Sequence, residues 1–197
     1  MKLSIIVVNY NTRDITLQCL KSLEKYPLTQ KFEVILVDNG STDGSEKIFS
    51  KYKSKAFKFL YIYNQDNLGF SKGNNIGLKK SIGEYKLLLN SDTEVLKNSL
   101  NDYLKFSEKL KDAGVVGCKL LNTDKSIQSS VFRLPNISRA FTQYVLGKNN
   151  ILDKYYPKTK LAIEVESVVG AAFLITPQAL KKVGGLSENY FMYFEDL

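Results

Sequence analysis

The sequence predicts an α/β fold in which a central, mostly parallel sheet is flanked by helices. Short apolar runs rich in Val, Ile and Leu alternate with helical patterns over residues 1–118. This alternation is typical of parallel strands joined by helical crossovers. Polar residues directly follow most of these runs. Because parallel sheets bind ligands beyond the carboxyl ends of their strands, those residues are the first candidates for a site.

Each expected element in the first half has its own local signal. The expected strands are short, apolar and rich in β-branched or aromatic residues, and they cover 3–8, 32–37, 57–63, 85–89 and 114–118. The first helix follows from the stripe Ile15, Cys19, Leu20 and Leu23, with Pro27 closing it. The turn 41–45 is rich in capping residues and introduces a helix over 46–52. Further helices are expected within 69–81, after a loop, and over 98–111.

The second half is less regular and predicts a smaller, mixed β region. We expect a strand-and-turn excursion over 122–135 and a loop-and-helix insertion over 136–157. One buried strand is expected over 165–176, and a short helix begins at Pro177 and covers 177–182.

Composition narrows the chemistry. The 197 residues carry a net charge of +8 and contain no His, so catalysis must rest on carboxylates, amides or a metal held by oxygen. Lysines cluster within 47–58 and 148–160. Each lysine cluster has two interpretations: an ordinary solvated face, or a surface that attracts anionic lipid headgroups or a diphosphate substrate. No recognition-helix or finger pattern is present, so no nucleic-acid partner is expected.

The sequence also predicts the state of the two cysteines and the cellular location of the protein. Cys19 and Cys118 lie in apolar patterns and are expected to be buried free thiols. The run 3–8 is too short for a signal peptide, and no run is long enough to span a membrane. We therefore expect a cytoplasmic protein, either soluble or peripheral at the inner face of the membrane.

Two acidic residues stand at predicted strand ends. Asp92 directly follows the strand 85–89 and suits a hard divalent cation that a diphosphate also binds. Asp38 follows the strand 32–37 and could accept hydrogen bonds from a nucleoside. A turn role for either residue is the competing interpretation. A turn role does not explain why both strands end in an acidic residue, and this repetition favours a ligand-binding site.

Two further segments have the composition of a ligand site. Within 67–77, Gly69, Gly73 and Gly77 recur at intervals of four, which lets backbone approach a ligand or a strand, and Lys72 could reach a phosphate. Near the end of the chain, Glu195 and Asp196 follow aromatic residues. An apolar setting raises a carboxyl pKa, which suits a general base.

Taken together, these motifs resemble the family 2 glycosyltransferases with a GT-A fold, and within them the rhamnosyltransferase-like members. The similarity is carried by ordered motifs at 4–11, 37–45, 67–75, 88–93, 169–175 and 191–196. It runs nearly end to end. Residues 122–135 also contain Gln128 and Arg133 in a pattern typical of those members, with no settled role.

The resemblance implies a role for each matching residue. Asp196, beside Glu195, is implied as the catalytic base, and Asp92 as the ligand of a divalent metal, Mg²⁺ or Mn²⁺. The implied nucleotide-sugar contacts are Asn9, Tyr10, Asp38, Asn67, Gly69, Lys72, Asn74, Asn90 and Ser91. The implied reaction transfers a sugar, rhamnose being one option, from a UDP- or dTDP-sugar to a glycan or lipid-linked acceptor with inversion, in cell-surface polysaccharide synthesis.

Two departures from the family pattern qualify this picture. Asn90 replaces the first Asp of the D-x-D element, so the metal would have one carboxylate fewer. The chain also ends at Leu197, where the family pattern continues. We expect one domain over 1–197, with a nucleotide-sugar-binding half at 1–118 and an acceptor-side half at 119–197 that is truncated at its C-terminus.

Two other functions remain open from the sequence. A nucleotidyltransferase would normally carry a Gly-rich loop after the first strand, and residues 9–13 contain no glycine. A non-catalytic nucleotide-sugar-binding module of a larger synthase is the main alternative.

Overall fold

The computed structural model describes residues 1–149, 152–159 and 161–189. They form two compact units, and each unit is described by itself. The first unit contains residues 1–116 and the described residues from 170 onwards, and the second contains residues 117–169.

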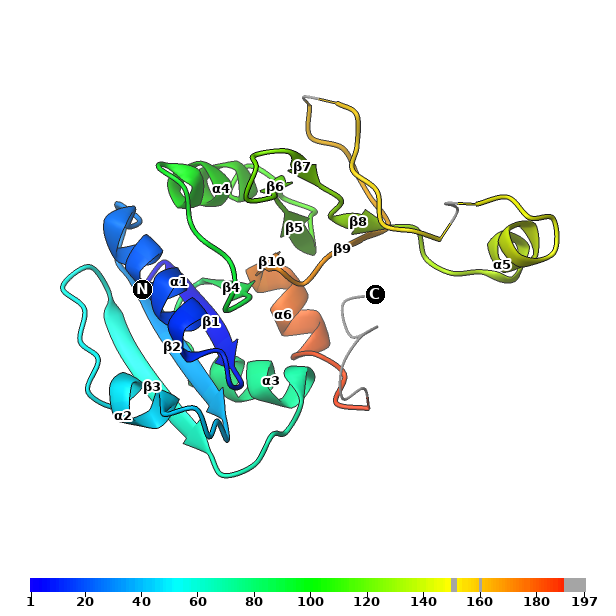
Figure 1. The fold of residues 1–197 in the computed structure, drawn as a ribbon. Coiled ribbons are helices and arrows are strands. Elements are labelled where there is room, and N and C mark those ends of the chain that lie inside the picture. The colour runs from blue at the N-terminus through cyan, green and yellow to red at the C-terminus, as the bar shows by residue number, and fades with distance from the viewer. Residues whose placement is uncertain (150–151, 160, 190–197) are drawn as a thin grey trace. The chain divides into compact units, whose positions relative to one another are not determined.

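The first unit is built on a six-stranded sheet with the order β3-β2-β1-β4-β10-β5 (Figure 1). Its strands are β1 (Leu3–Asn9), β2 (Phe32–Asn39), β3 (Lys58–Asn64), β4 (Tyr85–Leu89), β5 (Val115–Gly117) and β10 (Ala172–Ile175). β1 pairs in parallel with β2 and β4, and β2 pairs in parallel with β3. β10 lies antiparallel to β4. The expected mostly parallel α/β sheet is therefore confirmed.

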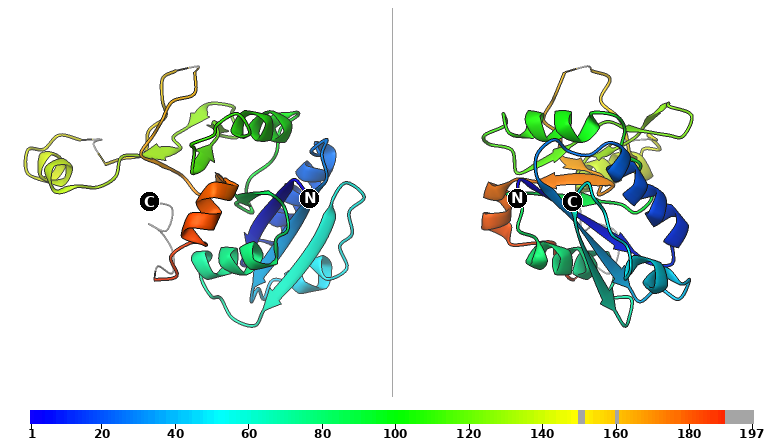
Figure 2. Two further views of the ribbon diagram at one scale, coloured as in Figure 1. Left: turned by 180° about the vertical axis from the view of Figure 1, so that it is seen from behind. Right: turned by 90° about the vertical axis from the view of Figure 1, so that its left-hand side faces the viewer.

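Helices cover both faces of this sheet. They are α1 (Arg13–Lys25), α2 (Ser45–Phe49), α3 (Phe70–Lys80), α4 (Ser99–Ser107) and α6 (Pro177–Val183). Figure 2 shows α1 and α2 on one side of the strands and α3 and α6 on the other. This distribution follows from right-handed crossovers, because the chain moves from β1 to β3 in one direction and then returns to β4.

The core beneath α3 and α6 depends on a close approach between a helix and a strand. Ile6, Leu78, Leu88 and Ile175 form a buried cluster there. A Cβ added at Gly77 would lie 2.4 Å from Ile6 Cγ2, so the absence of a side chain lets α3 rest directly on β1. The spacing of the glycines thus has a packing role at this position.

The second unit contains short antiparallel pairs and one helix. β6 (Leu120–Leu121) pairs with β7 (Ile127–Gln128), and β8 (Val131–Phe132) pairs with β9 (Ser167–Val168). α5 (Ile137–Tyr144) begins after Asn136, whose Oδ1 accepts a hydrogen bond from Arg139 N at 2.8 Å. The predicted mixed β region and its helical insertion are present.

One prediction in this region is wrong. The single strand expected over 165–176 is two strands, β9 and β10, which pair with different partners and belong to different units. A continuous apolar run indicates burial along its length, but it does not indicate where the chain passes from one pairing partner to another. Predicted helix ends also moved, since α4 ends at Ser107 rather than at 111.

Both cysteines are free thiols, with Cys19 buried and Cys118 half-buried. Within the described ranges, every helix is too short or too polar to cross a membrane.

Candidate active site

The carboxyl ends of β1, β2, β3 and β4 meet at one edge of the sheet because these strands are parallel. The strand order reverses at β1, which lies between β2 and β4. Ligands of open α/β sheets bind at this reversal, beyond the strand ends. The segments that follow β1 and β4 are therefore the two sides of the candidate site.

Asn9, at the end of β1, connects several segments at this edge through hydrogen bonds of its side chain. Its side chain is fully buried, and its Nδ2 donates to Ser41 Oγ and Ser45 Oγ, each at 3.0 Å. Its Oδ1 accepts from the hydroxyls of Thr12 and Thr16, each at 2.9 Å. All of the hydrogen-bonding capacity of the amide is used within the protein. The predicted nucleotide contact at Asn9 could then involve its backbone, while its side chain shapes the surrounding loops.

Hydrogen bonds continue from Asn9 to both neighbouring strands. Thr12 Oγ1 lies 3.3 Å from Ser91 Oγ, beyond β4. On the other side, Ser41 N donates to Asp38 Oδ1 at 3.0 Å, at the end of β2. One hydrogen-bonded network, made of side chains and the backbone N–H of Ser41, therefore connects the segment after β4 with the end of β2.

Asp38 is fully buried and has a partner on each carboxylate oxygen. Its Oδ1 accepts from Ser41 N, which is the turn role expected of an aspartate here, and its Oδ2 accepts from Tyr61 OH at 2.9 Å. Burial, followed by the hydrogen bond to Asp38, raises the pKa of Tyr61 above its ordinary value. Each carboxylate oxygen keeps one further acceptor position, so a nucleoside donor could still bind if it reached the group.

Asp43 has a structural role at this edge that the sequence analysis did not single out. Its Oδ2 accepts from Arg13 N at the start of α1, at 2.8 Å. Its Oδ1 accepts from Ser45 N at 3.0 Å and Ser45 Oγ at 2.6 Å at the start of α2. Neither helix has a side-chain hydrogen bond from its own N-cap residue, Thr12 or Gly44. One carboxylate thus caps two helices, and only the fold could have revealed the second one.

Asn39, at the end of β2, connects this strand with the end of β3 and the start of α3. Its Nδ2 donates to Gly69 O at 3.0 Å, and its Oδ1 accepts from Asn64 Nδ2 at 2.8 Å. A Cβ at Gly73 would lie 3.0 Å from Asn39 Nδ2, so the first turn of α3 packs directly on this amide. The end of β3 and the start of α3 are in this way joined to the end of β2.

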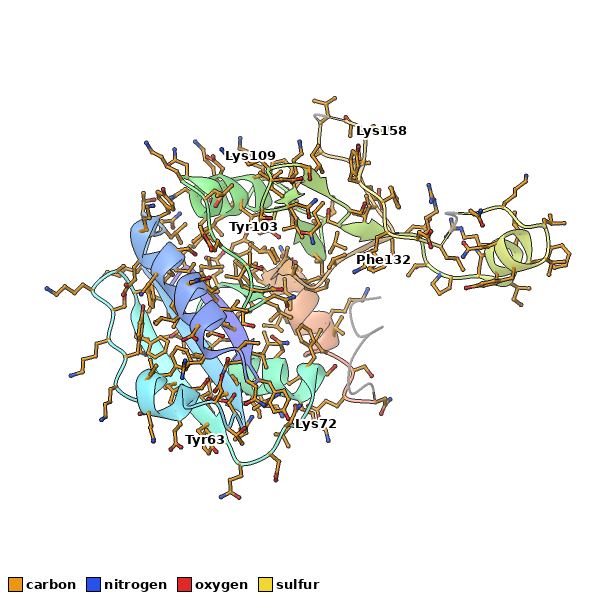
Figure 3. All side chains as sticks on the ribbon, viewed as in Figure 1. Tyr63, Lys72, Tyr103, Lys109, Phe132 and Lys158 are labelled. Atoms are coloured by element: carbon orange, nitrogen blue, oxygen red, sulfur yellow. The ribbon has the colours of Figure 1, made fainter. Side chains whose placement is uncertain are left out.

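The remaining predicted nucleotide contacts lie around this edge. Tyr10 is 47% exposed after β1, and Lys72 is exposed in the first turn of α3. Figure 3 places Lys72 and Tyr63, which stands near the end of β3, at the same edge of the first unit. Asn67 Oδ1 accepts from Gly69 N at 3.0 Å, while the buried Asn74 donates to Phe70 O at 3.0 Å. Asn67 therefore supports the turn before α3, and Asn74 supports the first turn of α3 itself.

The segment after β4 provides the candidate metal ligand. Asn90 N donates to Ala171 O at 3.0 Å, which connects this segment to β10, while Ser91 is half-buried and Asp92 is exposed. Burial, with the negative charges of Asp92 and Glu94, raises the pKa of the nearby Cys19 thiol to about 12, so that thiol stays protonated near neutral pH.

The described residues at this edge offer few ligands for a divalent cation. In the part of the chain that the structure describes, no cluster of three or more Asp, Glu, Cys or His side chains could hold a metal. Asp92 alone suits a hard cation only if the phosphates of a substrate supply further ligands, which is the way Mg²⁺ commonly binds.

The predicted base, Asp196, and its neighbour Glu195 lie outside the described residues. The structure does describe a contact that approaches them along the chain. Asn75, in α3, donates through Nδ2 to Leu186 O at 2.9 Å and accepts through Oδ1 from Leu186 N at 2.9 Å. The sequence analysis did not assign a role to Asn75.

Comparison with known proteins gives a consistent result. The profile of the family described as "Glycosyl transferase family 2" matches residues 4–184. The poly(ribitol-phosphate) beta-N-acetylglucosaminyltransferase TarS of Staphylococcus aureus is 33% identical to this chain over 208 residues, which cover 98% of the chain and 35% of TarS. The chain therefore spans about a third of that relative.

Solved structures agree on the fold. The structure of S. aureus TarS 1-349 in complex with UDP-GlcNAc matches 68% of this chain and 39% of that one, with a TM-score of 0.57 and 30% identity. The mannosyltransferase PcManGT from Pyrobaculum calidifontis, solved with GDP-Man and Mn²⁺, matches 95% of this chain and 48% of that one. Its TM-score is 0.63 at 15% identity, which supports the fold alone. The expected GT-A fold is confirmed.

Proposed function

The chain belongs to glycosyl transferase family 2, and on that premise we propose that it transfers a sugar from a UDP-sugar to a hydroxyl group of a cell-envelope polymer, with inversion at the anomeric carbon. The acceptor we propose is a polyol-phosphate or related glycan chain. This choice is supported by TarS, whose name describes a poly(ribitol-phosphate) acceptor, and by the complex of TarS with UDP-GlcNAc. Transfer of rhamnose from a dTDP-sugar is the competing donor assignment.

One observation carries the proposal. The hydrogen-bonded chain Asp38–Ser41–Asn9–Thr12–Ser91 runs along the edge of the sheet where its strand order reverses. A nucleoside diphosphate has to be held at two separate points, the base with its ribose and the phosphates. This network connects the predicted nucleoside residue, Asp38, with the segment that contains the predicted phosphate-side residue, Asp92.

The proposed reaction is a single displacement. The acceptor oxygen attacks the anomeric carbon, the bond from that carbon to the diphosphate oxygen breaks, and UDP leaves with the electron pair. Asp196 takes the proton of the acceptor hydroxyl. A divalent cation held by Asp92 and the phosphates would supply charge neutralisation for the leaving group. Lys72 contributes positive charge at the same edge of the sheet.

Isothermal titration calorimetry with UDP, dTDP and GDP, with and without Mn²⁺, tests the donor and metal assignments. We expect UDP to bind most tightly, and Mn²⁺ alone to bind weakly because the described residues contain no group of three or more Asp, Glu, Cys or His side chains that could hold a metal. The Asp92→Ala variant should lower UDP affinity at least tenfold in Mn²⁺ and leave the metal-free affinity unchanged.

Glu94→Ala is the matched control, since it removes an exposed carboxylate from the same loop and should leave UDP affinity within twofold. Equal UDP affinity of Asp92→Ala and the wild type in Mn²⁺ would refute the metal role. Tighter binding of dTDP than UDP would support the rhamnose donor.

Activity is measured with the full-length protein, UDP-GlcNAc and a polyol-phosphate polymer. Asp196→Asn should abolish transfer while keeping UDP affinity. UDP binding without any transfer by the wild type would instead favour a non-catalytic nucleotide-sugar-binding module. The proposal also assigns residues 1–118 to the nucleotide sugar and 119–197 to the acceptor, and it places the protein in the cytoplasm, either free or associated with the inner face of the membrane.

A further inference from the structure

Asn11 has a backbone conformation that few side chains adopt. It follows Tyr10 directly in the loop between β1 and α1, and its φ is +54°, in the left-handed region. Asparagine is tolerated there because its short amide can hydrogen-bond locally, whereas most residues with a Cβ are strained. The residue is exposed, so core packing does not impose this conformation. Specific contacts must therefore hold it.

These contacts come from the turn that follows β2. Asn11 N donates to Ser41 Oγ at 2.9 Å, and Asn11 Oδ1 accepts from Thr42 N at 2.8 Å and, at 3.4 Å, from Thr42 Oγ1. The turn also contacts the first loop, because Asp43 Oδ2 accepts from Arg13 N at 2.8 Å. Each loop therefore supplies one side chain that binds the backbone of the other. The loops after two neighbouring parallel strands are joined in this way.

The joined loops contain two residues that are predicted to bind the nucleoside. Tyr10, which is 47% exposed, lies between Asn9 and Asn11, and both of these donate to Ser41 Oγ. Ser41 N in turn donates to Asp38 Oδ1 at 3.0 Å. The backbone on either side of Tyr10 is thereby connected to Asp38 through one residue.

The turn after β2 has little freedom to shift. Gly40 has a φ of +74°, and an added Cβ would lie 2.8 Å from Gln65 O. The turn is therefore in close contact with the segment that follows β3. A loop that is hydrogen-bonded to this turn is fixed relative to the end of β2.

We propose that Asn11 is a positioning residue for the nucleoside end of the donor, which keeps Tyr10 at a fixed spacing from Asp38. This inference rests on the proposed function, in which both residues bind the nucleoside of the UDP-sugar. Asn11 acts through the two loops, whereas the predicted phosphate-side residue, Asp92, follows β4 and belongs to neither loop. Loss of Asn11 should therefore weaken binding of the nucleoside and leave the turnover of bound donor unchanged.

The direct test is Asn11→Gly in the full-length protein. Glycine adopts a positive φ freely, so the substitution removes the acceptor of Thr42 N without adding backbone strain. We expect the Kd for UDP and the KM for UDP-GlcNAc to rise at least fivefold, with kcat within twofold of wild type. The preference for UDP over GDP should fall at least threefold, because a displaced Tyr10 discriminates less well between bases. Amide hydrogen exchange at Thr42, measured without ligand, should accelerate at least fivefold.

Two further variants separate the hydrogen bond from general effects on stability. Asn11→Asp keeps an oxygen acceptor for Thr42 N and tolerates the left-handed region, so the Kd for UDP should stay within twofold of wild type. Asn98→Ala is the matched control. Asn98 is likewise exposed and has a φ of +65°, but it stands at the start of α4 and belongs to neither loop. Its replacement should lower stability and leave the Kd for UDP within twofold.

The outcomes separate the two proposals. If the wild type binds UDP and Asn11→Gly has the same Kd, the positioning role is wrong and the proposed function stays intact. An equally raised Kd in Asn11→Gly and Asn11→Asp, or an equal loss of affinity in Asn11→Gly and Asn98→Ala, would also overturn the positioning role alone. A wild-type protein that neither binds UDP nor transfers sugar would overturn both.

Discussion

Replacing Asp43 by alanine should destabilise the first unit, because this one carboxylate caps both α1 and α2. The substitution removes the acceptor of Arg13 N at 2.8 Å and the acceptor of Ser45 N at 3.0 Å and Ser45 Oγ at 2.6 Å. Loss of a capping side chain costs roughly 0.5–2 kcal/mol for one helix. α2 is much shorter than α1, so the loss of its cap should cost less. For the two helices together we expect a loss of about 2–3 kcal/mol in the free energy of unfolding.

The assay is chemical and thermal unfolding of wild type and Asp43→Ala, and the expected loss corresponds to a fall in melting temperature of roughly 5–10 °C for a chain of this size. Asp14→Ala is the matched control. Asp14 lies in the first turn of α1 and pairs with Arg13, but its side chain is 73% exposed, so its removal should change stability far less.

The effect should also depend on pH. Partial burial alone would raise the pKa of Asp43, but the hydrogen bonds from Ser45 and Arg13 outweigh it and hold the pKa below its ordinary value. A carboxylate with a lowered pKa in the folded state stabilises the protein above its unfolded pKa of about 3.9 and loses that contribution as pH falls through the folded pKa. The difference between wild type and Asp43→Ala should therefore be largest near neutral pH and shrink below about pH 4.

Two results would refute this reasoning. A loss of stability below about 0.5 kcal/mol would mean that water replaces the carboxylate at both helix ends. A difference between wild type and Asp43→Ala that stays constant down to about pH 3 would mean that the charged carboxylate is not the stabilising species.

Two further predictions concern packing and an ion pair. Gly77→Ala should destabilise the first unit by about 1–3 kcal/mol in denaturant unfolding, because the added methyl group meets Ile6 Cγ2 and overpacks the core. Gly114→Ala, where the added Cβ would lie 3.7 Å from its nearest neighbour, should be close to neutral, and equal losses at both positions would contradict the packing argument. In the second unit, hydrogen bonds from Arg139 and from the backbone lower the pKa of Glu166 to about 2. A carboxyl NMR titration should show that midpoint, Arg139→Lys should raise it, and the pair should lose its stabilising effect only as pH falls from the ordinary glutamate value towards 2; a midpoint near 4 in the wild type would rule the pair out.

The sequence by itself was sufficient for the α/β class and for most element positions. Apolar runs such as 3–8 and 85–89 indicate strands because burial on both faces requires consecutive apolar residues. The parallel order then places the residues after β1, β2, β3 and β4 at one edge without knowledge of any contact. Asp38 and Asp92 were identified by this reasoning, and the structure places both at that edge.

Tertiary structure alone decided which partner each residue has. The run 165–176 divides between β8 and β4, because hydrophobic periodicity records burial and carries no information on the distant strand that a segment pairs with. Asn75 and Asp43 are similar cases. Their partners Leu186 and Arg13 lie far away in sequence, and only folding brings a polar side chain within hydrogen-bonding distance of a backbone group that would otherwise be left without a partner.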